Sequence, residues 1–441
     1  MTDAHSSPNG AKWLVGFLLY EFACQLLLLV PALGAIRVLL RIAAFGGSLA
    51  LLLMLPGKAL SKHPARTPLT IAVVLLAISA VNPTGGGLLA SAAHAALYLA
   101  ILSPVFWVAR LHVTLGAFER LMIAFWLYYT ASAAVGLLQV YFPGRFQPPL
   151  ASILAERGPA YLDSMMIELA SGESVLRPMG LTDAPGGAAG AGFYAALLGL
   201  GLVQARTKLP GARWLAAASM LIGVMILYLA QVRSLLVVLG LSTIVLTVLH
   251  ALAARLSRFV VIAAVSAAIA MVAYSFAVEL GGSSVTSRLA TLTADAPGKV
   301  YYTNRGIFLE YTFVELLPRF PLGGGLGRWG MMNTYFGSAA SALWVEIQWT
   351  GWLIDGGVPL ILAYAAAVLV TIRQVAKTAL SREGHALASW APLVAAYGVG
   401  VLALTFNATP FMGTSGLEFW LINAAFFQAL TTASAGAESS A

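Results

Sequence analysis

The side chains best suited to chemistry in this sequence are arginines that lie outside the short basic loops. A guanidinium group stays charged at physiological pH, and its planar fork of N–H donors matches phosphate oxygens. Eleven basic residues remain on one side once the basic loops are assigned to the other, and all but one are arginine: Arg37, Arg41, Arg145, Arg157, Arg177, Arg233, Arg288, Lys299, Arg305, Arg319 and Arg328. This bias indicates a ligand that carries phosphate. The alternative for any one loop arginine is a snorkelling side chain or an ion pair.

Three of these arginines are expected within or beside hydrophobic helices. Arg37 and Arg41 are four residues apart, so they share one face at the start of a helix over 36–55. Arg233 lies in a tight turn between two apolar segments. Charge inside a membrane helix usually faces a cavity or a partner. We therefore expect these three to line a ligand cavity, and we expect Glu21, in the first apolar segment, to neutralise Arg41 or another buried cation.

One carboxylate is a candidate base. Glu346 lies in the stretch ALWVEIQWTGWLIDGGVP, where a long apolar helix is expected to begin. A partly buried carboxylate can take a proton from a sugar hydroxyl group. The alternative is that Glu346 forms an ion pair with an arginine, and that the tryptophans around it form an ordinary interfacial belt.

Two long polar segments, 143–186 and 281–343, carry many of these groups. The first ends in RPMGLTDAPGGAAGAGFY, which contains Arg177 and Asp183 and leads into the next helix. Its glycines either bring the backbone close to a ligand or allow membrane helices to pack closely. Both interpretations remain open from the sequence.

The second polar segment is expected to contain a short amphipathic helix over 305–317, capped by Asn304 or Thr303 and stopped by Pro318. The run PLGGGLGRWG that follows has the spacing GxGxxG. No strand of a βαβ unit precedes it, so we reject a dinucleotide site. A sharp turn beside a ligand is the preferred interpretation.

Hydrophobic helices must position these groups. Of the 441 residues, 60% are hydrophobic and 10% are charged, against about 25% charged in soluble proteins. The composition predicts an all-α polytopic membrane protein, with each span needing about 20 apolar residues. We expect about twelve spans, near 12–31, 36–55, 69–82, 88–109, 117–142, 187–205, 213–230, 232–250, 258–280, 344–372, 387–406 and 416–433. The expected organisation is helices over 1–142, a first long loop over 143–186, helices over 187–280, a second long loop over 281–343, helices over 344–433 and a tail over 434–441.

The positive charges set the expected orientation. With the N-terminus in the cytoplasm, every short basic loop falls inside, as the positive-inside rule requires. Both termini are then cytoplasmic and both long polar segments face outward. The net charge of +8 is explained by this topology, so no nucleic-acid partner is expected.

Other classes of chemistry have no support in the sequence. The lone Cys24 excludes an intramolecular disulfide and a cysteine-rich metal site. There is no HExxH motif, no P-loop and no serine hydrolase elbow, and neither long polar segment contains a histidine. We expect no metal and no cofactor.

The order of these features resembles the O-antigen polymerase and O-antigen ligase superfamily of bacterial inner-membrane glycosyltransferases. The similar stretches are RPMGLTDAPG from Arg177, QVRSLLVVLG around Arg233, NRGIFLEYTFVELLPRFPLGGGLG around Arg305 and EIQWTGWLIDGGV from Glu346. The chain departs from the family pattern at Gly186, at Val232, and at Glu346 with Ile347, where the family has an Asn, a Ser and a His-Asn pair.

The resemblance implies transfer of a glycan from an undecaprenyl-diphosphate donor to an acceptor sugar hydroxyl on the periplasmic side of the bacterial inner membrane, without a metal. In that scheme Arg177, Arg233 and Arg305 hold the diphosphate and Glu346 orients or deprotonates the hydroxyl. The expected substrate-binding residues are Arg37, Arg41, Asp183, Arg328, Tyr301, Tyr302, Trp329 and Tyr335, the aromatic members by stacking on sugar rings. Besides the lipid-linked donor and acceptor and the lipid bilayer, the expected partners are chain-length regulator and flippase proteins.

Three functions are compatible with the sequence. The first is a polymerase of lipid-linked repeat units that makes O-antigen or exopolysaccharide. The second is a ligase that attaches the glycan to lipid A-core or protein, which the missing histidine disfavours. The third, from another class, is a lipid-linked oligosaccharide flippase or other transporter. The concentration of polar residues in two outer segments favours an enzyme over a transporter.

Overall fold

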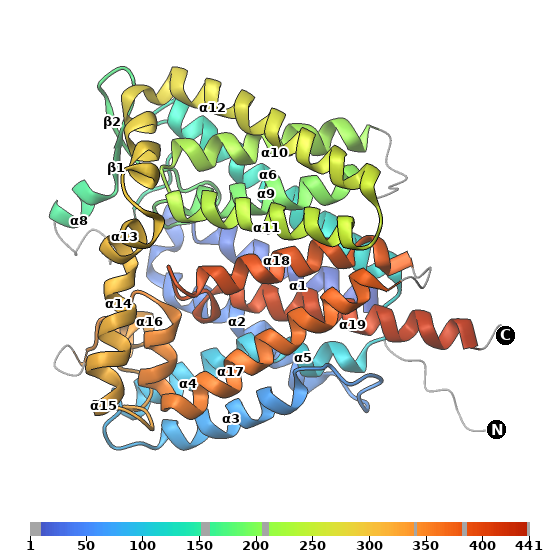
Figure 1. Ribbon diagram of the computed structural model, residues 1–441. Helices are drawn as coiled ribbons and strands as arrows, with labels where there is room; N and C mark the ends of the chain where they lie inside the picture. The colour runs from blue at the N-terminus through green and yellow to red at the C-terminus, as the bar shows by residue number, and fades with distance from the viewer. Residues whose placement is uncertain (1–9, 151–158, 205–210, 339–341, 382–385, 439–441) are drawn as a thin grey trace.

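The computed structural model describes residues 10–150, 159–204, 211–338, 342–381 and 386–438. Apart from one short β-hairpin, the regular structure is helical, and the long helices lie side by side between two ends of a bundle (Figure 1). The expectation of an α-helical fold is confirmed.

The elements follow one another in three groups. The first group is α1 (Gly10–Leu27), η1 (Pro31–Ile36), α2 (Arg37–Met54), α3 (Arg66–Ala80), α4 (Leu88–Leu102), α5 (Pro104–Trp107), η2 (Val108–Arg110) and α6 (Leu115–Tyr141). The second is α8 (Pro159–Ser164), β1 (Met166–Glu168), β2 (Ser174–Leu176), α9 (Gly187–Gln204), α10 (Ala212–Leu229), α11 (Arg233–Leu252) and α12 (Leu256–Thr293). The third is α13 (Pro297–Tyr301), η3 (Tyr302–Gly306), α14 (Ile307–Glu310), η4 (Tyr311–Leu316), α15 (Leu317–Arg319), α16 (Gly330–Phe336), α17 (Gln348–Leu380), η6 (Ala386–Ser389), α18 (Ala391–Leu404), η7 (Pro410–Met412) and α19 (Thr414–Glu438).

Five helices among the described residues are long and apolar enough to cross a bilayer. They are Pro31–Met54, Leu115–Tyr141, Arg233–Leu252, Leu256–Ala290 and Gln348–Leu380, with a sixth if the bent pair Leu88–Leu102 and Pro104–Arg110 forms one span. The protein is therefore a multi-pass membrane protein. The expectation of about twelve spans is wrong by this measure, because several apolar stretches form helices of only 10–17 residues, shorter than the roughly 20 that a span needs.

Several basic connections meet at one end of the bundle, on the right in Figure 1. The backbone N–H of Leu60 donates to the carbonyl of Ala109 (2.7 Å), and Arg255 donates to the carbonyl of Ala388 (3.1 Å). We call this the basic end and define it by the connections 55–65, 108–114, 253–255 and 386–390.

The two long polar segments meet at the opposite end, on the left in Figure 1, where α8, the hairpin and α13 to α16 lie. The N–H of Ala170 donates to the carbonyl of Leu280 (3.0 Å), and the hydroxyl of Tyr301 donates to the carbonyl of Phe406 (3.2 Å). We call this the loop end and define it by the described residues of 28–36, 81–87, 142–186, 294–347 and 405–413. Both polar segments are thus on the same side of the apolar bundle.

Close helix packing explains one of the glycines of α9. A Cβ added at Gly223 of α10 would lie 2.5 Å from the carbonyl oxygen of Gly192 of α9. Two glycines therefore let these helices approach, as small residues do in membrane bundles. At Gly192, the packing interpretation is the correct one.

The helical part of the second polar segment is longer than expected. It begins at Pro297 and continues through α13, η3, α14 and η4 to Arg319 of α15, with two π-helical stretches at η3 and η4. The expected cap at Asn304 is wrong, because Asn304 lies inside the helix and its side-chain amide donates to the carbonyl of Val300 (2.7 Å). The proline at Pro297 begins the helix, since a proline at the first position costs no hydrogen bond.

Candidate functional site at the loop end

Three arginines from separate segments approach one another at the loop end. Arg177 follows β2, Arg233 begins α11 and Arg288 lies on α12, and all three are half-buried. Burial, and then the positive charges of Arg288 and Arg233, hold the pKa of Arg177 below its ordinary value. We call these three residues the arginine cluster.

The arginine cluster has no acidic partner among the residues that the structure describes: the five ion pairs there use other side chains. The Nε atom of Arg177 is buried and has no hydrogen-bond partner in that part of the chain. Arg233 donates to the hydroxyl of Thr291, which in turn donates to the backbone carbonyl of Arg288 (2.6 Å). Three half-buried positive charges without a counter-charge form a site that favours an anion.

The β-hairpin and a bend in α12 hold these segments together. Gly282 has φ +58°, and an added Cβ there would lie 3.0 Å from the Cα atom of Ala170 in the hairpin. The amide of Gln231, two residues before Arg233, donates to the hydroxyl of Ser284 (2.9 Å). The hairpin, the start of α11 and the end of α12 are therefore joined directly.

Arg305 and Glu346 form an ion pair at the same end. The side chains are 37% and 24% exposed, so solvent reaches both. Arg233 connects this pair to the arginine cluster, because its second guanidinium nitrogen donates to Asn304 (3.1 Å), next to Arg305. The geometry therefore favours the ion-pair interpretation of Glu346 over a free carboxylate.

Arg37 and Arg41 meet Asp183. Arg41 donates to the carboxylate, and Arg37 lies 3.9 Å from it and donates to the carbonyl of Leu28 (2.9 Å). Asp183 is buried, so the cluster ties α2 to the segment before α9. The structure brings these three predicted residues together as a network of ion pairs.

An apolar cavity of about 350 Å³ lies beside this network. Its walls are mostly aliphatic and aromatic side chains of α2, α4 and α16, while Arg41, Asp183 and Tyr335 supply polar groups. Tyr335 thus lines a cavity whose walls are mostly apolar and whose charged groups lie at one place. Such a cavity suits a lipid chain that ends in an anionic group.

The predicted aromatic residues occupy different environments. Tyr302 is 49% exposed, donates to Glu310, and lines an open groove of about 600 Å³ with Tyr311 and Trp344. Tyr301 is half-buried, and its hydroxyl is bound to Phe406. A sugar ring can reach Tyr302 more readily than Tyr301.

Arg328 is half-buried and Trp329 is buried, so neither forms an exposed binding surface. The guanidinium carbon of Arg328 lies 5.2 Å from the centre of the Phe320 ring. Trp329 is only 5% exposed, and its indole N–H donates to Asp355 (2.9 Å). The expectation that Trp329 stacks on sugar rings is wrong, because its ring is buried inside the protein.

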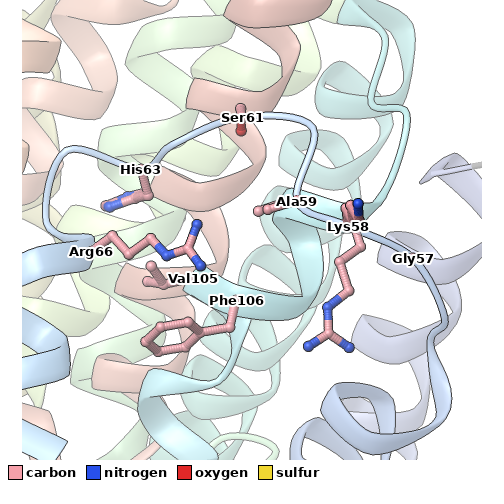
Figure 2. Close-up of a pocket in the computed structure, with 10 residues that line it drawn as sticks. Gly57, Lys58, Ala59, Ser61, His63, Arg66, Val105 and Phe106 are labelled. Atoms are coloured by element: carbon pink, nitrogen blue, oxygen red, sulfur yellow. The ribbon is translucent and has the colours of Figure 1, made fainter.

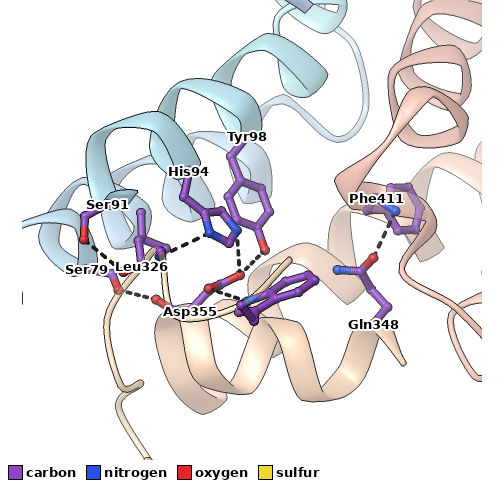
Figure 3. A network of polar contacts seen from close by, with 10 residues as sticks. Ser79, Ser91, His94, Tyr98, Leu326, Gln348, Asp355 and Phe411 are labelled. Carbon is purple, nitrogen blue, oxygen red and sulfur yellow. Dashed lines mark hydrogen bonds and ion pairs between the residues drawn. The ribbon is translucent and has the colours of Figure 1, made fainter. Parts of the chain in front are cut away.

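Asp355 is the centre of a buried polar network (Figure 3). It has no exposed surface, and it accepts hydrogen bonds from Trp329 and from the hydroxyl of Tyr98 (2.7 Å). His94 Nε2 lies 3.5 Å from the same carboxylate, and His94 Nδ1 accepts from the N–H of Gly327 (3.1 Å). The network joins α4, α17 and the glycine run. Only the polarity of Asp355 and His94 within apolar stretches could have signalled it in the sequence.

The glycine run 323–330 packs against neighbouring backbone. Gly325 and Gly327 have φ +86° and +77°, and Cβ atoms added there would lie 2.8 Å from Gly85 and 2.6 Å from Ala90. The N–H of Gly86 donates to the carbonyl of Leu326 (2.8 Å). The sharp turn was predicted correctly, but Gly325 makes room for the α3–α4 connection and Gly327 makes room for the first turn of α4, rather than for a ligand.

Glu21 is not neutralised by Arg41, which pairs with Asp183 instead. Glu21 is buried among the helices, its Oε2 has no hydrogen-bond partner among the described residues, and it interacts electrostatically with Glu418. Glu418 accepts hydrogen bonds from Tyr129 and from Tyr194 (2.5 Å). The expected partner of Glu21 was wrong: the charged group beside it is a second acid.

Comparison with known proteins adds no family to this description. No family model matches the chain, and no curated protein matches its sequence. Within the described residues, no three histidine, cysteine or acidic side chains gather in a way that could hold a metal ion.

Proposed function

We propose that the protein transfers a glycan from a polyprenyl-diphosphate donor to a sugar hydroxyl, as a polymerase of lipid-linked repeat units at the periplasmic face of a bacterial inner membrane. The observation that carries the proposal is the arginine cluster of Arg177, Arg233 and Arg288, which has no carboxylate partner among the described residues. A diphosphate leaving group departs with added negative charge, which preorganised guanidinium groups stabilise.

In this proposal the arginine cluster binds the diphosphate, and Arg305 turns from Glu346 toward the same oxygens. Glu346 is then free to accept a hydrogen bond from the attacking hydroxyl. The hydroxyl oxygen forms a bond to the anomeric carbon as the bond from that carbon to the diphosphate oxygen breaks. The proton passes to Glu346, and the electron pair leaves with the diphosphate.

The apolar cavity beside Arg41 and Asp183 supports a lipid-linked donor. Its volume of about 350 Å³ accommodates part of an isoprenoid chain, whose remainder would lie in the bilayer. Tyr302, on its exposed groove, is the aromatic residue best placed to stack on an acceptor sugar. Chain-length regulator and flippase proteins are the partners that such an enzyme would need.

One observation favours the transporter alternative. Glu21 and Glu418 are buried among the helices, and acids inside a membrane often mark an ion or proton pathway. An enzyme whose chemistry is at the loop end does not require them. The decisive experiment must therefore separate glycosyl transfer from translocation.

The test uses purified protein in proteoliposomes with undecaprenyl-diphosphate repeat units. We expect a ladder of polymers, lost in Arg177→Ala and kept in the control Arg145→Ala, which removes an exposed arginine at the same end. Product that forms only when lipid A-core is added would identify a ligase. Donor that crosses the bilayer unchanged, with no product under either condition, would identify a flippase and overturn the proposal.

A further inference from the structure

A second cavity lies at the basic end, which is the opposite end of the helix bundle from the arginine cluster. Its volume is about 380 Å³, and it is lined by the connection 57–66 and by residues of α5 and η2 (Figure 2). The proposed glycosyl transfer makes no use of it. Its lining therefore needs an explanation of its own.

The cavity is lined by three cations and by no carboxylate: Lys58, Arg66 and Arg110 contribute to it. Arg110 is fixed, because its guanidinium donates to the carbonyls of Leu52 (2.7 Å) and Leu55 (2.8 Å). Within the described chain, the side chains of Lys58 and Arg66 form no ion pair. Figure 2 shows Arg66 reaching from the start of α3 beneath the connection.

His63, in the same connection, is buried against the helices behind the cavity. It is 5% exposed, and its Nδ1 accepts from the N–H of Ala65 (3.1 Å), which leaves the proton on Nε2. This Nε2 is buried without a hydrogen-bond partner among the described residues. Burial lowers the pKa of His63 to about 3, so the ring is a neutral donor at pH 7. The ring packs edge-on against Phe427 and Trp420 of α19, with ring centres 4.9 and 6.1 Å away, so it holds the connection onto the helix bundle.

The floor of the cavity is apolar, formed by Val105, Phe106 and Ala109. Positive charges at the edge and hydrocarbon beneath them match a lipid whose phosphate lies at the membrane surface and whose chains begin below it. A free phosphate would use the charges but not the floor.

We propose that this cavity binds the phosphate group of an anionic lipid, with Lys58 and Arg66 as its ion-pair donors. The site is independent of the proposed glycosyl transfer and of its arginine cluster. Arg110 positions the turn and contributes further positive charge.

The test measures lipid binding to the full chain in detergent by native mass spectrometry. The probes are dioleoyl phosphatidic acid, dioleoyl glycerol, which lacks the phosphate, and inorganic phosphate as a competitor. We expect phosphatidic acid to bind and dioleoyl glycerol not to bind. The double variant Lys58→Ala/Arg66→Ala should weaken binding by about tenfold or more, since each lost charge-assisted bond contributes more than a neutral one.

The matched control is Arg373→Ala/Lys377→Ala, which removes two exposed cations of α17 that do not line the cavity. It should change lipid affinity by less than about twofold. Equal losses in both double variants would overturn the proposal in favour of a diffuse positive surface, and so would equal binding of dioleoyl glycerol. If the double variant unfolds, the single change Lys58→Ala, in an exposed connection, provides the same comparison.

Inorganic phosphate distinguishes the two sources of the anion. Displacement of phosphatidic acid by millimolar phosphate would support recognition of the phosphate group. A phosphate-induced rise in thermal stability that is lost in Lys58→Ala/Arg66→Ala, with no lipid bound, would assign the cavity to free phosphate and overturn the lipid proposal.

Discussion

Six arginines at or next to the loop end fall into two sets that differ in whether a carboxylate faces them. Arg37, Arg41 and Arg305 each have a carboxylate, Asp183 or Glu346. The arginine cluster of Arg177, Arg233 and Arg288 has none in the described part of the chain. Paired charges stabilise the fold that contains them, whereas unpaired half-buried charges are retained at a cost that a ligand can offset. The two sets should therefore respond to substitution in opposite ways.

The largest effect is expected at Arg177. Arg177→Ala should lower polymer formation by about 100- to 1,000-fold, the usual loss when one preorganised charge-stabilising donor is removed. Thermal stability should stay the same or rise, because a half-buried charge repelled by two other arginines is gone. A gel of the polymer ladder and a melting curve on the same sample provide both measurements. A large fall in stability with full activity per folded molecule would break the distinction between the two sets.

Arg288 extends the comparison to a residue that sequence reasoning did not place in the site. Its charge acts on both Arg177 and Arg233. Arg288→Ala should lower activity by about 10- to 100-fold, with Arg288→Lys recovering part of it because charge, though not the planar fork, is restored. Full activity in Arg288→Ala, measured at several donor concentrations, would remove this residue from the proposed diphosphate site.

Among the paired residues, substitution of Asp183 should mainly lower the stability of the fold. Asp183→Ala leaves Arg37 and Arg41 without their carboxylate, and should lower the free energy of unfolding by about 2 kcal/mol. Activity of the molecules that remain folded should change little. The control is Lys299→Ala, which breaks an exposed pair with Asp295 and should cost about 0–1 kcal/mol. Equal losses in the two variants, measured by thermal unfolding in the same detergent, would contradict the difference in burial on which this prediction depends.

Features of the fold and the site that depend on residues close together in the sequence could be predicted, whereas features that depend on distant residues could not. The helical class and the gathering of both polar segments at one end depend on local composition, so the sequence predicted them. The number of spans was wrong, because apolar stretches such as those of α3 and α18 form helices of only 15 and 14 residues, which are shorter than a span needs. Arg177 and Arg233 were singled out from the sequence around them, and their role in a site stays a prediction.

The partners of charged residues could not be predicted, since they come from distant segments. Arg41 and Asp183 are 142 residues apart, and Tyr98 and Asp355 are 257 apart. A single sequence gives no signal for such pairs. For the same reason Trp329, which looks like a surface aromatic beside Arg328, is instead buried against Asp355.

Glu346 is paired with Arg305 and is also the proposed base. Among the proposed catalytic residues, its substitution should cause the smallest change in activity. Its ion pair with Arg305 is partly exposed, so Glu346→Gln should lower stability by less than about 1 kcal/mol. If Glu346 accepts the proton of the attacking hydroxyl, kcat should fall by at least about tenfold while KM stays within about twofold, because an amide cannot act as the base. A change in KM alone, measured by varying the acceptor, would instead mean that the Arg305–Glu346 pair only shapes the site. Stabilisation of the leaving group by the arginine cluster would then be the catalytic contribution that remains. The paired residues would serve only to hold the structure.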